Sequence, residues 1–419
     1  MHTFLIILAV IAFFMIVLED VIHLNKAKTT LFLGTLSWLV LFLFPADGVT
    51  PKQIQGMLNE NLLEIASLWL FLMAAMTFVA FLNHQGLIET MIYKFLPSRV
   101  GEKALLFMVA IFAFAFSSLS DNITATLVSV ALVLSLKLPP NKTLKFAVMV
   151  VFAVNSGGVS LITGDVTTLM IFLADKVAIQ DLLWLALPAF VSVIFLAGLL
   201  SFGLKGELLI DGGERHYDKV GMSIGILFLF TILSTIVLNI IAGIPPVLTF
   251  LFGLSIMFLI GRFFHTDDDR ENMLDYIRVI EFDTLLFFLG ILLLVGMLKE
   301  IGVLDHLVKV YEVLPPIQAN YVMGLLSSLV DNVPLTAALL KANLDMTPAS
   351  WLSLTYGVGV GGSLLIIGSA AGIVAMSKIK EVTFISYMKY SFFLLLAYTL
   401  GFAGSYGVGT VLFNVPNSY

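Results

Sequence analysis

Long apolar runs recur along the whole chain and constrain its fold more than any other feature. They cover residues 3–18, 30–44, 67–82, 182–204, 220–241, 246–260, 285–298 and 391–413. Most are long enough to cross the roughly 30 Å hydrocarbon core of a bilayer as helices, which satisfy their backbone hydrogen bonds internally. Charged residues make up only 12% of the sequence, about half the share found in a soluble domain. The sequence therefore predicts an all-α polytopic membrane protein surrounded by lipid.

The composition excludes several classes of site. The chain has no Cys, so neither disulfides nor thiolate metal ligands are available. Its six His are scattered and its net charge of -6 contains no long block of one sign, so we expect no nucleic-acid partner. The first apolar run lacks a basic flank and a small-residue cleavage site, so we interpret it as a retained helix rather than a signal peptide.

Four segments contain too many small and polar residues to be simple spans. They are 103–138, broken at 117–122; 145–174, broken at 155–160 and 163–168; 321–343, broken at 327–334; and 351–377, broken at 357–363 and 368–372. Short paired arms are typical of re-entrant helical hairpins, and Gly-rich breaks are typical of unwound helices.

The interruptions belong to an internal repeat. SSLSDN from Ser117 matches SSLVDN from Ser327, and the glycines Gly157 and Gly158 match Gly361 and Gly362. Because the elements follow one another in the same order in both halves, we interpret the protein as a tandem duplication.

The repeat predicts the domain organisation. We expect an N-terminal repeat at 1–204, a solvated cytoplasmic linker at 205–219 and a C-terminal repeat at 220–419. Each repeat would contain scaffold helices, a hairpin, a broken helix and a last helix. These elements are expected at 1–102, 103–138, 145–175 and 182–204 in the first repeat, and at 220–299, 319–343, 351–377 and 387–413 in the second.

The distribution of Lys and Arg predicts the orientation, because loops rich in these residues stay in the cytoplasm. Most of them lie in the inside loops if both termini are outside, the first hairpin enters from inside and the second hairpin enters from outside. The two repeats are then inverted relative to one another. Inverted repeats with helix breaks near mid-membrane are typical of secondary transporters, whose substrate site lies where the breaks meet.

Asp121, Asp165 and Asp331 are the acidic residues that lie deepest in the predicted membrane segments, and all three occur at helix breaks. Each could act as a helix N-cap, a position where Asp is favoured. However, an ionised Asp in hydrocarbon costs several kcal/mol unless it is paired, hydrated or bound to a cation. We therefore interpret these three residues as sodium ligands, and expect no other metal or cofactor.

Oxygen atoms are abundant around these aspartates, and oxygen ligands favour small hard cations. Ser117, Ser118, Thr124 and Thr126 surround the first tip, and Ser327, Ser328 and Thr336 surround the second. Burial favours the protonated carboxyl group and a bound cation favours the carboxylate, so proton and cation compete for the same group. This competition provides an exchange mechanism without a further proton-handling residue.

The segment TGDVTT places Thr167 and Thr168 within about one helical turn of Asp165, with Asn155 across the Gly157-Gly158 break. The counterpart of Asp165 in the second repeat is Ser369, so the expected site is asymmetric.

Glu64 and Glu281 precede matched apolar stretches and are interpreted as the first residues of matched helices. They either interact only with the positive helix N-terminus or line a proton or ion path. Asp283 is interpreted as an acidic residue of the first helical turn.

The stretches LFLMAAMTFVAF, SSLSDNITATL, NSGG…TGDVTT, EFDTLLFFLGILLLVGML and SSLVDNVPLTAALL resemble the NhaD-type sodium/proton antiporters of the ion transporter superfamily, from about residue 64 to 377. The resemblance implies two inverted repeats, an elevator-like movement, a homodimer, and exchange of sodium or lithium for protons across a bacterial inner membrane. It also implies an ion site formed by Asp121, Asn122, Thr124, Asn155, Asp165, Thr167, Thr168, Ser327, Asp331, Asn332 and Ser369.

Two other functions fit the sequence less well. Sister families with the same scaffold move dicarboxylates, citrate or arsenite, but an Asp at each tip would repel an anion and no Arg lies near either break. An intramembrane aspartyl protease would need a Gly where the chain has Ile162, and a second Tyr-Asp pair in a helix, whereas Tyr217-Asp218 falls in the linker. We therefore expect a transporter and not an enzyme.

Overall fold

The computed structural model describes residues 2–17, 25–45, 48–87, 97–209, 219–264, 275–342 and 344–413. The elements of the first half are α1 (His2–Val17), α3 (Lys26–Leu43), α4 (Pro51–His84), β1 (Arg99–Gly101), α6 (Glu102–Leu119), α7 (Asn122–Ser135), α8 (Pro140–Gly158), α9 (Val166–Leu173), α10 (Ile179–Trp184), α11 (Ala186–Ser201) and β2 (Glu207–Leu209).

The second half is built in the same way. Its elements are α12 (Lys219–Ala242), α13 (Pro246–Phe264), α14 (Asp275–Val279), α15 (Phe282–Glu300), α16 (Asp305–Val313), α17 (Pro316–Leu326), α18 (Asn332–Lys341), α19 (Pro348–Gly361), the 3₁₀ helix η1 (Ile366–Gly368), α20 (Ala370–Lys378), α21 (Phe384–Met388) and α22 (Ser391–Phe413).

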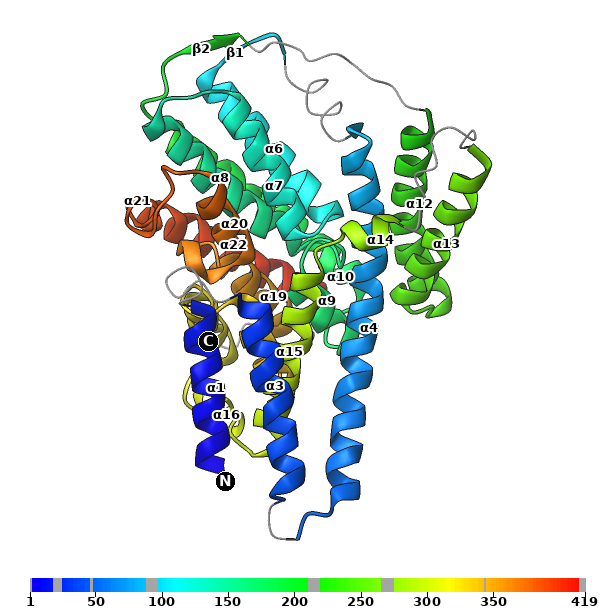
Figure 1. Ribbon diagram of the computed structural model, residues 1–419. Coiled ribbons are helices and arrows are strands. Elements are labelled where there is room, and N and C mark those ends of the chain that lie inside the picture. The colour runs from blue at the N-terminus through cyan, green and yellow to red at the C-terminus, as the bar shows by residue number, and fades with distance from the viewer. Residues whose placement is uncertain are drawn as a thin grey trace.

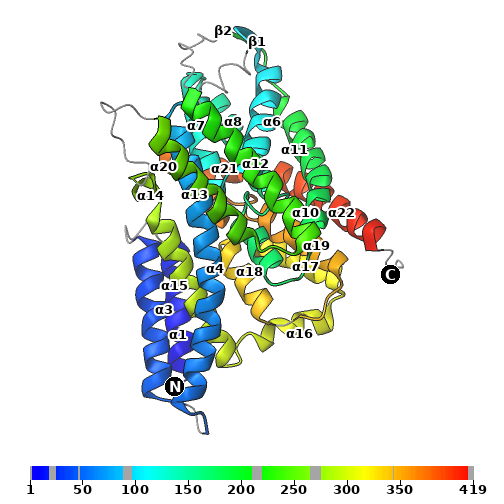
Figure 2. The same cartoon turned by 90° about the vertical axis from the view of Figure 1, so that its right-hand side faces the viewer.

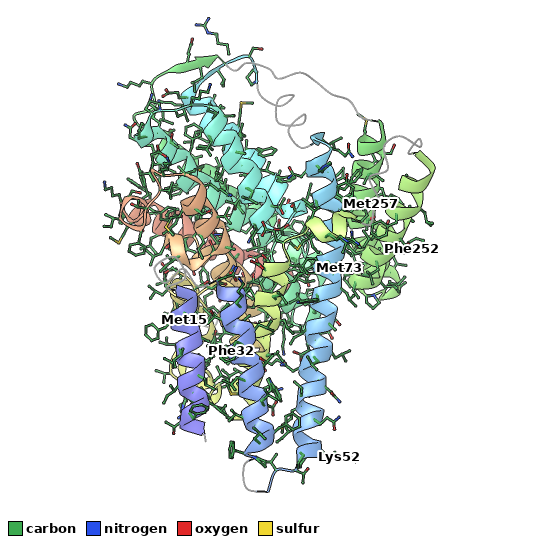
Figure 3. The ribbon with its side chains drawn as sticks, in the orientation of Figure 1. Met15, Phe32, Lys52, Met73, Phe252 and Met257 are labelled. Carbon is green, nitrogen blue, oxygen red and sulfur yellow. The ribbon has the colours of Figure 1, made fainter. Side chains whose placement is uncertain are left out.

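The prediction of an all-α polytopic membrane protein is confirmed. Within the described ranges, six helices are long and apolar enough to cross a membrane. Large apolar side chains on the outer helix faces support the same conclusion, because water would solvate them poorly. Phe32 on α3 and Phe252 on α13, both labelled in Figure 3, are each 65% exposed.

The helices pack in two groups (Figure 1). In the first, which we call the panel, α3 packs along α15 and against α1, while α4 packs against α15 and α13, and α12 packs against α13. In the second, which we call the hairpin group, α6 and α7 pack on α8, α17 packs on α19, and α11 and α22 pack on each other. Figure 2 shows α1, α3 and α15 side by side in the panel, while α17, α18 and α19 lie on the other side of α4 in this view.

Equivalent contacts occur in the two repeats, in agreement with the predicted duplication. The Ser117 hydroxyl donates a hydrogen bond to the Val154 carbonyl oxygen at 2.7 Å, and the Ser327 hydroxyl donates to the Val358 carbonyl oxygen at 2.8 Å. Each bond fixes the tip of a hairpin (α6–α7 or α17–α18) to the first arm of a broken helix (α8–α9 or α19–α20).

The helix breaks begin later than the sequence predicts. Residues 155–158 remain in α8, and residues 357–361 remain in α19. The glycines here permit close packing rather than unwinding: a Cβ on Gly157 would clash with the Phe114 carbonyl oxygen, and one on Gly361 with the Gly324 carbonyl oxygen. The observed breaks lie at 159–165 and 362–369, the latter including η1.

Three other expected segments differ from the structure in detail. The last helix of the first repeat, expected at 182–204, is divided into α10 and α11. The helix that contains Glu64 begins at Pro51, where Thr50 and Gln53 form a capping box. The start of the linker expected at 205–219 forms β2, which pairs antiparallel with β1 and carries an Arg99–Glu207 ion pair. Residues 210–218 of this linker lie outside the described residues.

The packing at Gly157 gives a stability prediction. Gly157→Ala should destabilise the protein by about 1–3 kcal/mol, because overpacking against fixed backbone forces a shift of α6 or α8. Gly198→Ala on α11 is the matched control, because a Cβ there meets no atom within 4 Å. Thermal unfolding in detergent should show a lower melting temperature for Gly157→Ala only; equal melting temperatures would contradict the close packing.

Candidate functional site

Each of the four helix breaks ends in a residue whose side chain caps the next helix. Asp121 caps α7 by accepting the Ile123 and Thr124 amides at 3.1 and 2.9 Å, and Asp331 caps α18 by accepting the Val333 amide at 3.1 Å. Asp165 accepts the Thr167 amide at 3.1 Å to cap α9. Ser369 caps α20 in the same way. The capping role considered from the sequence is therefore real for all three aspartates.

Capping does not account for the position of these aspartates relative to one another. Asp121, Asp165 and Asp331 line one cavity of about 150 Å³ together with Asp283, and the described residues of its lining include no Lys, Arg or His. Asp165 and Asp331 are each only 5% exposed. Several acidic groups thus share a small space, and their negative charges repel one another.

Amide side chains connect the two repeats across this cavity. The Asn332 amide donates to a carboxylate oxygen of Asp165 at 3.3 Å, and the Asn155 amide donates to the Ser369 hydroxyl at 2.9 Å. The Asn122 amide donates to the Asn155 side-chain oxygen at 3.5 Å. Every predicted site residue in this network therefore contacts another one, and two of the bonds cross from one repeat to the other.

Two hydroxyl groups near the site are buried with no hydrogen-bond partner in the described structure. They are those of Ser120 and Ser156. The Cβ position of Gly359 lies 3.6 Å from an Asp165 carboxylate oxygen and 3.7 Å from the Thr167 hydroxyl oxygen, and a methyl group of Val159 fills the space beside it. A buried unpaired hydroxyl costs roughly 1–3 kcal/mol, and a bound cation would use its oxygen as a ligand.

The remaining predicted residues do not line the cavity themselves but form hydrogen bonds to its lining residues or to neighbouring backbone. The Thr124 hydroxyl donates to a carboxylate oxygen of Asp121 at 2.7 Å, and the Thr168 hydroxyl donates to the Gly158 carbonyl at 3.4 Å. Ser327 is fully buried and bonded to α19. Asn122 and Asn332 line the cavity directly, whereas Thr124, Thr168 and Ser327 do not.

Glu64 and Glu281, which the sequence matched between the two repeats, occupy different positions in their helices. Glu281 immediately precedes α15 but makes no capping hydrogen bond with its side chain, and its pKa is raised by loss of hydration and then by the negative charge of Asp121. Glu64 lies well inside α4 rather than at a helix start, and it forms an ion pair with Lys341 in a second cavity. The interpretation of Glu64 as a first residue is therefore wrong.

Two residues of the panel reach the site unexpectedly. Asn25 and Asp283 line the cavity, and the Asn25 amide donates to a carboxylate oxygen of Asp283 at 2.7 Å. The sequence pointed to Asp283 only as an acidic residue in a first helical turn. Nothing in the sequence pointed to Asn25, which in the structure is the N-cap of α3 and accepts the Ala27 amide at 2.8 Å.

The two hairpins differ in how they meet the panel. The second arm of the second hairpin, α18, packs along α15. Between described residues, the equivalent arm α7 has no comparable packing on α4. Instead the cavity lies there, bounded by Leu72 and Met76 of α4 and by Ile123 of α7.

Comparison with known proteins is consistent with this architecture. A family model described as a citrate transporter matches residues 4–355. A solved structure described as the YdaH transporter of Alcanivorax borkumensis has the same fold, with a TM-score of 0.58 and 14% identity over 92% of this chain and 99% of the other.

Curated relatives are similar over almost their whole length. The Na(+)/H(+) antiporter NhaD of Vibrio cholerae is 32% identical over 93% of this chain and 88% of its own. The Na(+)/H(+) antiporter NhaD of Alkalimonas amylolytica is 28% identical over 97% of this chain and 90% of its own. These relatives are transporters and not enzymes. The chain therefore belongs to the citrate transporter family and, within it, to the NhaD-type sodium/proton antiporters.

Proposed function

We propose that the protein exchanges sodium or lithium for protons by letting the cation and the proton compete for Asp121, Asp165 and Asp331. The observation that carries this proposal is the cavity lined by all three aspartates and, among the residues that the structure describes, by no basic side chain. In a poorly hydrated cavity, three ionised carboxylates repel one another strongly. Their negative charge must therefore be reduced by protons or balanced by a metal cation.

The same observation bears on the rival function, transport of citrate, another dicarboxylate or an oxyanion. Recognition of a carboxylate or phosphate-like group typically uses Arg, Lys or free backbone amides. Here Asp side chains already accept hydrogen bonds from first-turn backbone amides at the two tips. The described residues of the lining include no basic side chain. The cavity suits a small cation better than an organic anion.

Access to the site would alternate by movement of the hairpin group along the panel. With both termini outside, Asn25 and Asp283 begin α3 and α15 at the cytoplasmic face, so the cavity lies at the cytoplasmic ends of these helices. The arm α18 packs closely on α15, whereas α7 does not pack comparably on α4 between described residues, and this difference supports an inward-facing state. We include the elevator-like movement, the bacterial inner membrane and the homodimer in this proposal.

The first experiment measures exchange directly. In everted vesicles with an acidic interior, addition of sodium or lithium should dissipate the pH gradient, because protons leave as the cations enter. A pH-sensitive dye reports the change, and vesicles without the protein are the control. An unchanged gradient between pH 7 and 9.5 would contradict the proposal, and citrate or arsenite uptake in its place would support the rival function.

The second experiment separates ion binding from capping. Asp121→Asn and Asp331→Asn keep a good N-cap but remove the negative charge, so each should reduce exchange and sodium affinity at least tenfold without lowering the melting temperature. Isothermal titration of the purified protein with sodium measures the affinity. Asp181→Asn on α10, outside the cavity, is the matched control. Unchanged affinity in the two tip variants would leave them only the capping role.

Asp165→Asn gives an independent test of the proton step. Because Asn332 donates to Asp165, the neutral amide would keep the position occupied but could not bind a proton. Exchange should be lost, and sodium binding should no longer release protons into a weakly buffered solution. Proton release that persists in this variant would place the exchanged proton on another group.

A further inference from the structure

A second and larger cavity lies between the panel and the hairpin group, toward the other ends of the helices that line the aspartate cavity. Its volume is about 440 Å³. It lies between α4 and α15 of the panel and between α9 and α18 of the hairpin group. The charged residues that line it are Glu60, Glu64, Lys176, Lys299 and Lys341.

One ion pair crosses this cavity from one group to the other. Lys341 is the last residue of α18 and contacts the carboxylate of Glu64 on α4. The Lys341 side chain is only 13% exposed, whereas that of Glu64 is 54% exposed. The other two lysines are placed differently: Lys299 belongs to α15 of the panel itself, and Lys176 lies over the ring of Trp351 within the hairpin group.

A second carboxylate follows on the same helix face. Glu60 precedes Glu64 by one turn of α4 and lines the same cavity. Residues four apart lie on one face of a helix and are separated by about one pitch, 5.4 Å, along its axis. Because α4 begins at Pro51 on the proposed outer side, Glu60 is the outer of the two acidic positions.

We propose that Lys341 is a positioning residue that pairs with Glu64 when the site faces the cytoplasm and with Glu60 when it faces outside. The proposal rests on the sliding movement proposed above. Movement of α18 toward the outer end of α4 carries the Lys341 ammonium group from one carboxylate to the next. Each end position of the hairpin group thus has its own ion pair, and neither leaves the poorly exposed Lys341 without a partner.

Accessibility of the ion site provides the test. The chain has no Cys, so Ile123→Cys introduces a single thiol into the lining of the aspartate cavity. A membrane-impermeant maleimide should label this thiol from the cytoplasmic face in everted vesicles when the site faces inward. In right-side-out vesicles it labels only protein whose site faces outward.

In the Ile123→Cys protein, substitutions of the two glutamates should change the labelling rates in opposite directions. Glu64→Gln should slow cytoplasmic labelling and speed external labelling several-fold, whereas Glu60→Gln should speed cytoplasmic and slow external labelling. The exchanged pair Glu64→Lys with Lys341→Glu should restore the inward ion pair and cytoplasmic labelling, but external labelling should be slow because the carboxylate now at position 341 would meet Glu60. Glu381→Gln, at an exposed position that lines neither cavity, should leave both rates unchanged and serves as the control.

The outcomes distinguish the ion pairs from the movement itself. Labelling of Ile123→Cys from both faces, with equal rates in Glu64→Gln, Glu60→Gln and the parent, would overturn the role of Lys341 and leave the movement intact. Labelling from the cytoplasmic face alone under all sodium and proton gradients would contradict the movement. Changes of the same sign in both glutamate variants would also overturn the proposal, because they indicate a general loosening of the interface.

Discussion

Burial of the carboxyl groups of Asp121, Asp165 and Asp331 in one small cavity is the constraint on which the structure depends. Each group lies at a helix N-terminus, where amides of the first turn and the helix dipole stabilise a negative charge. This stabilisation is of the order of 1 kcal/mol per group, less than the several kcal/mol that burial of an ion costs. The difference agrees with the proposal that protons or cations neutralise these carboxylates.

The duplicated architecture brings these groups together. A single repeat provides one hairpin tip and one broken helix, and the amide of Asn332 from the second repeat completes the surroundings of Asp165 from the first. The bond between Asn155 and Ser369 joins the repeats again on the same side. The site therefore exists only where both repeats meet, and the Asp165–Ser369 difference makes it asymmetric.

The sequence was sufficient for the features that depend on local composition. Apolar runs identified the spans, and the two Asp-Asn tips identified the hairpins because an Asp in hydrocarbon is rare without a function. Features that depend on distant neighbours were not predictable. Gly157 and Gly361 resemble helix breakers in sequence, yet carbonyl groups of another helix occupy the space beside them. Asn25 and the Glu64–Lys341 pair depend on how the panel meets the hairpin group, and the predicted domain boundaries remain predictions.

The short ribbon of β1 and β2 has a mechanical consequence. The chain passes from α4 into α6 through β1, and it passes from α11 to α12 through β2. Both connections between the panel and the first half of the hairpin group therefore run through a single two-stranded clasp, which the Arg99–Glu207 pair also holds. Both connections thus join the hairpin group at one place, so the movement proposed above would displace them together.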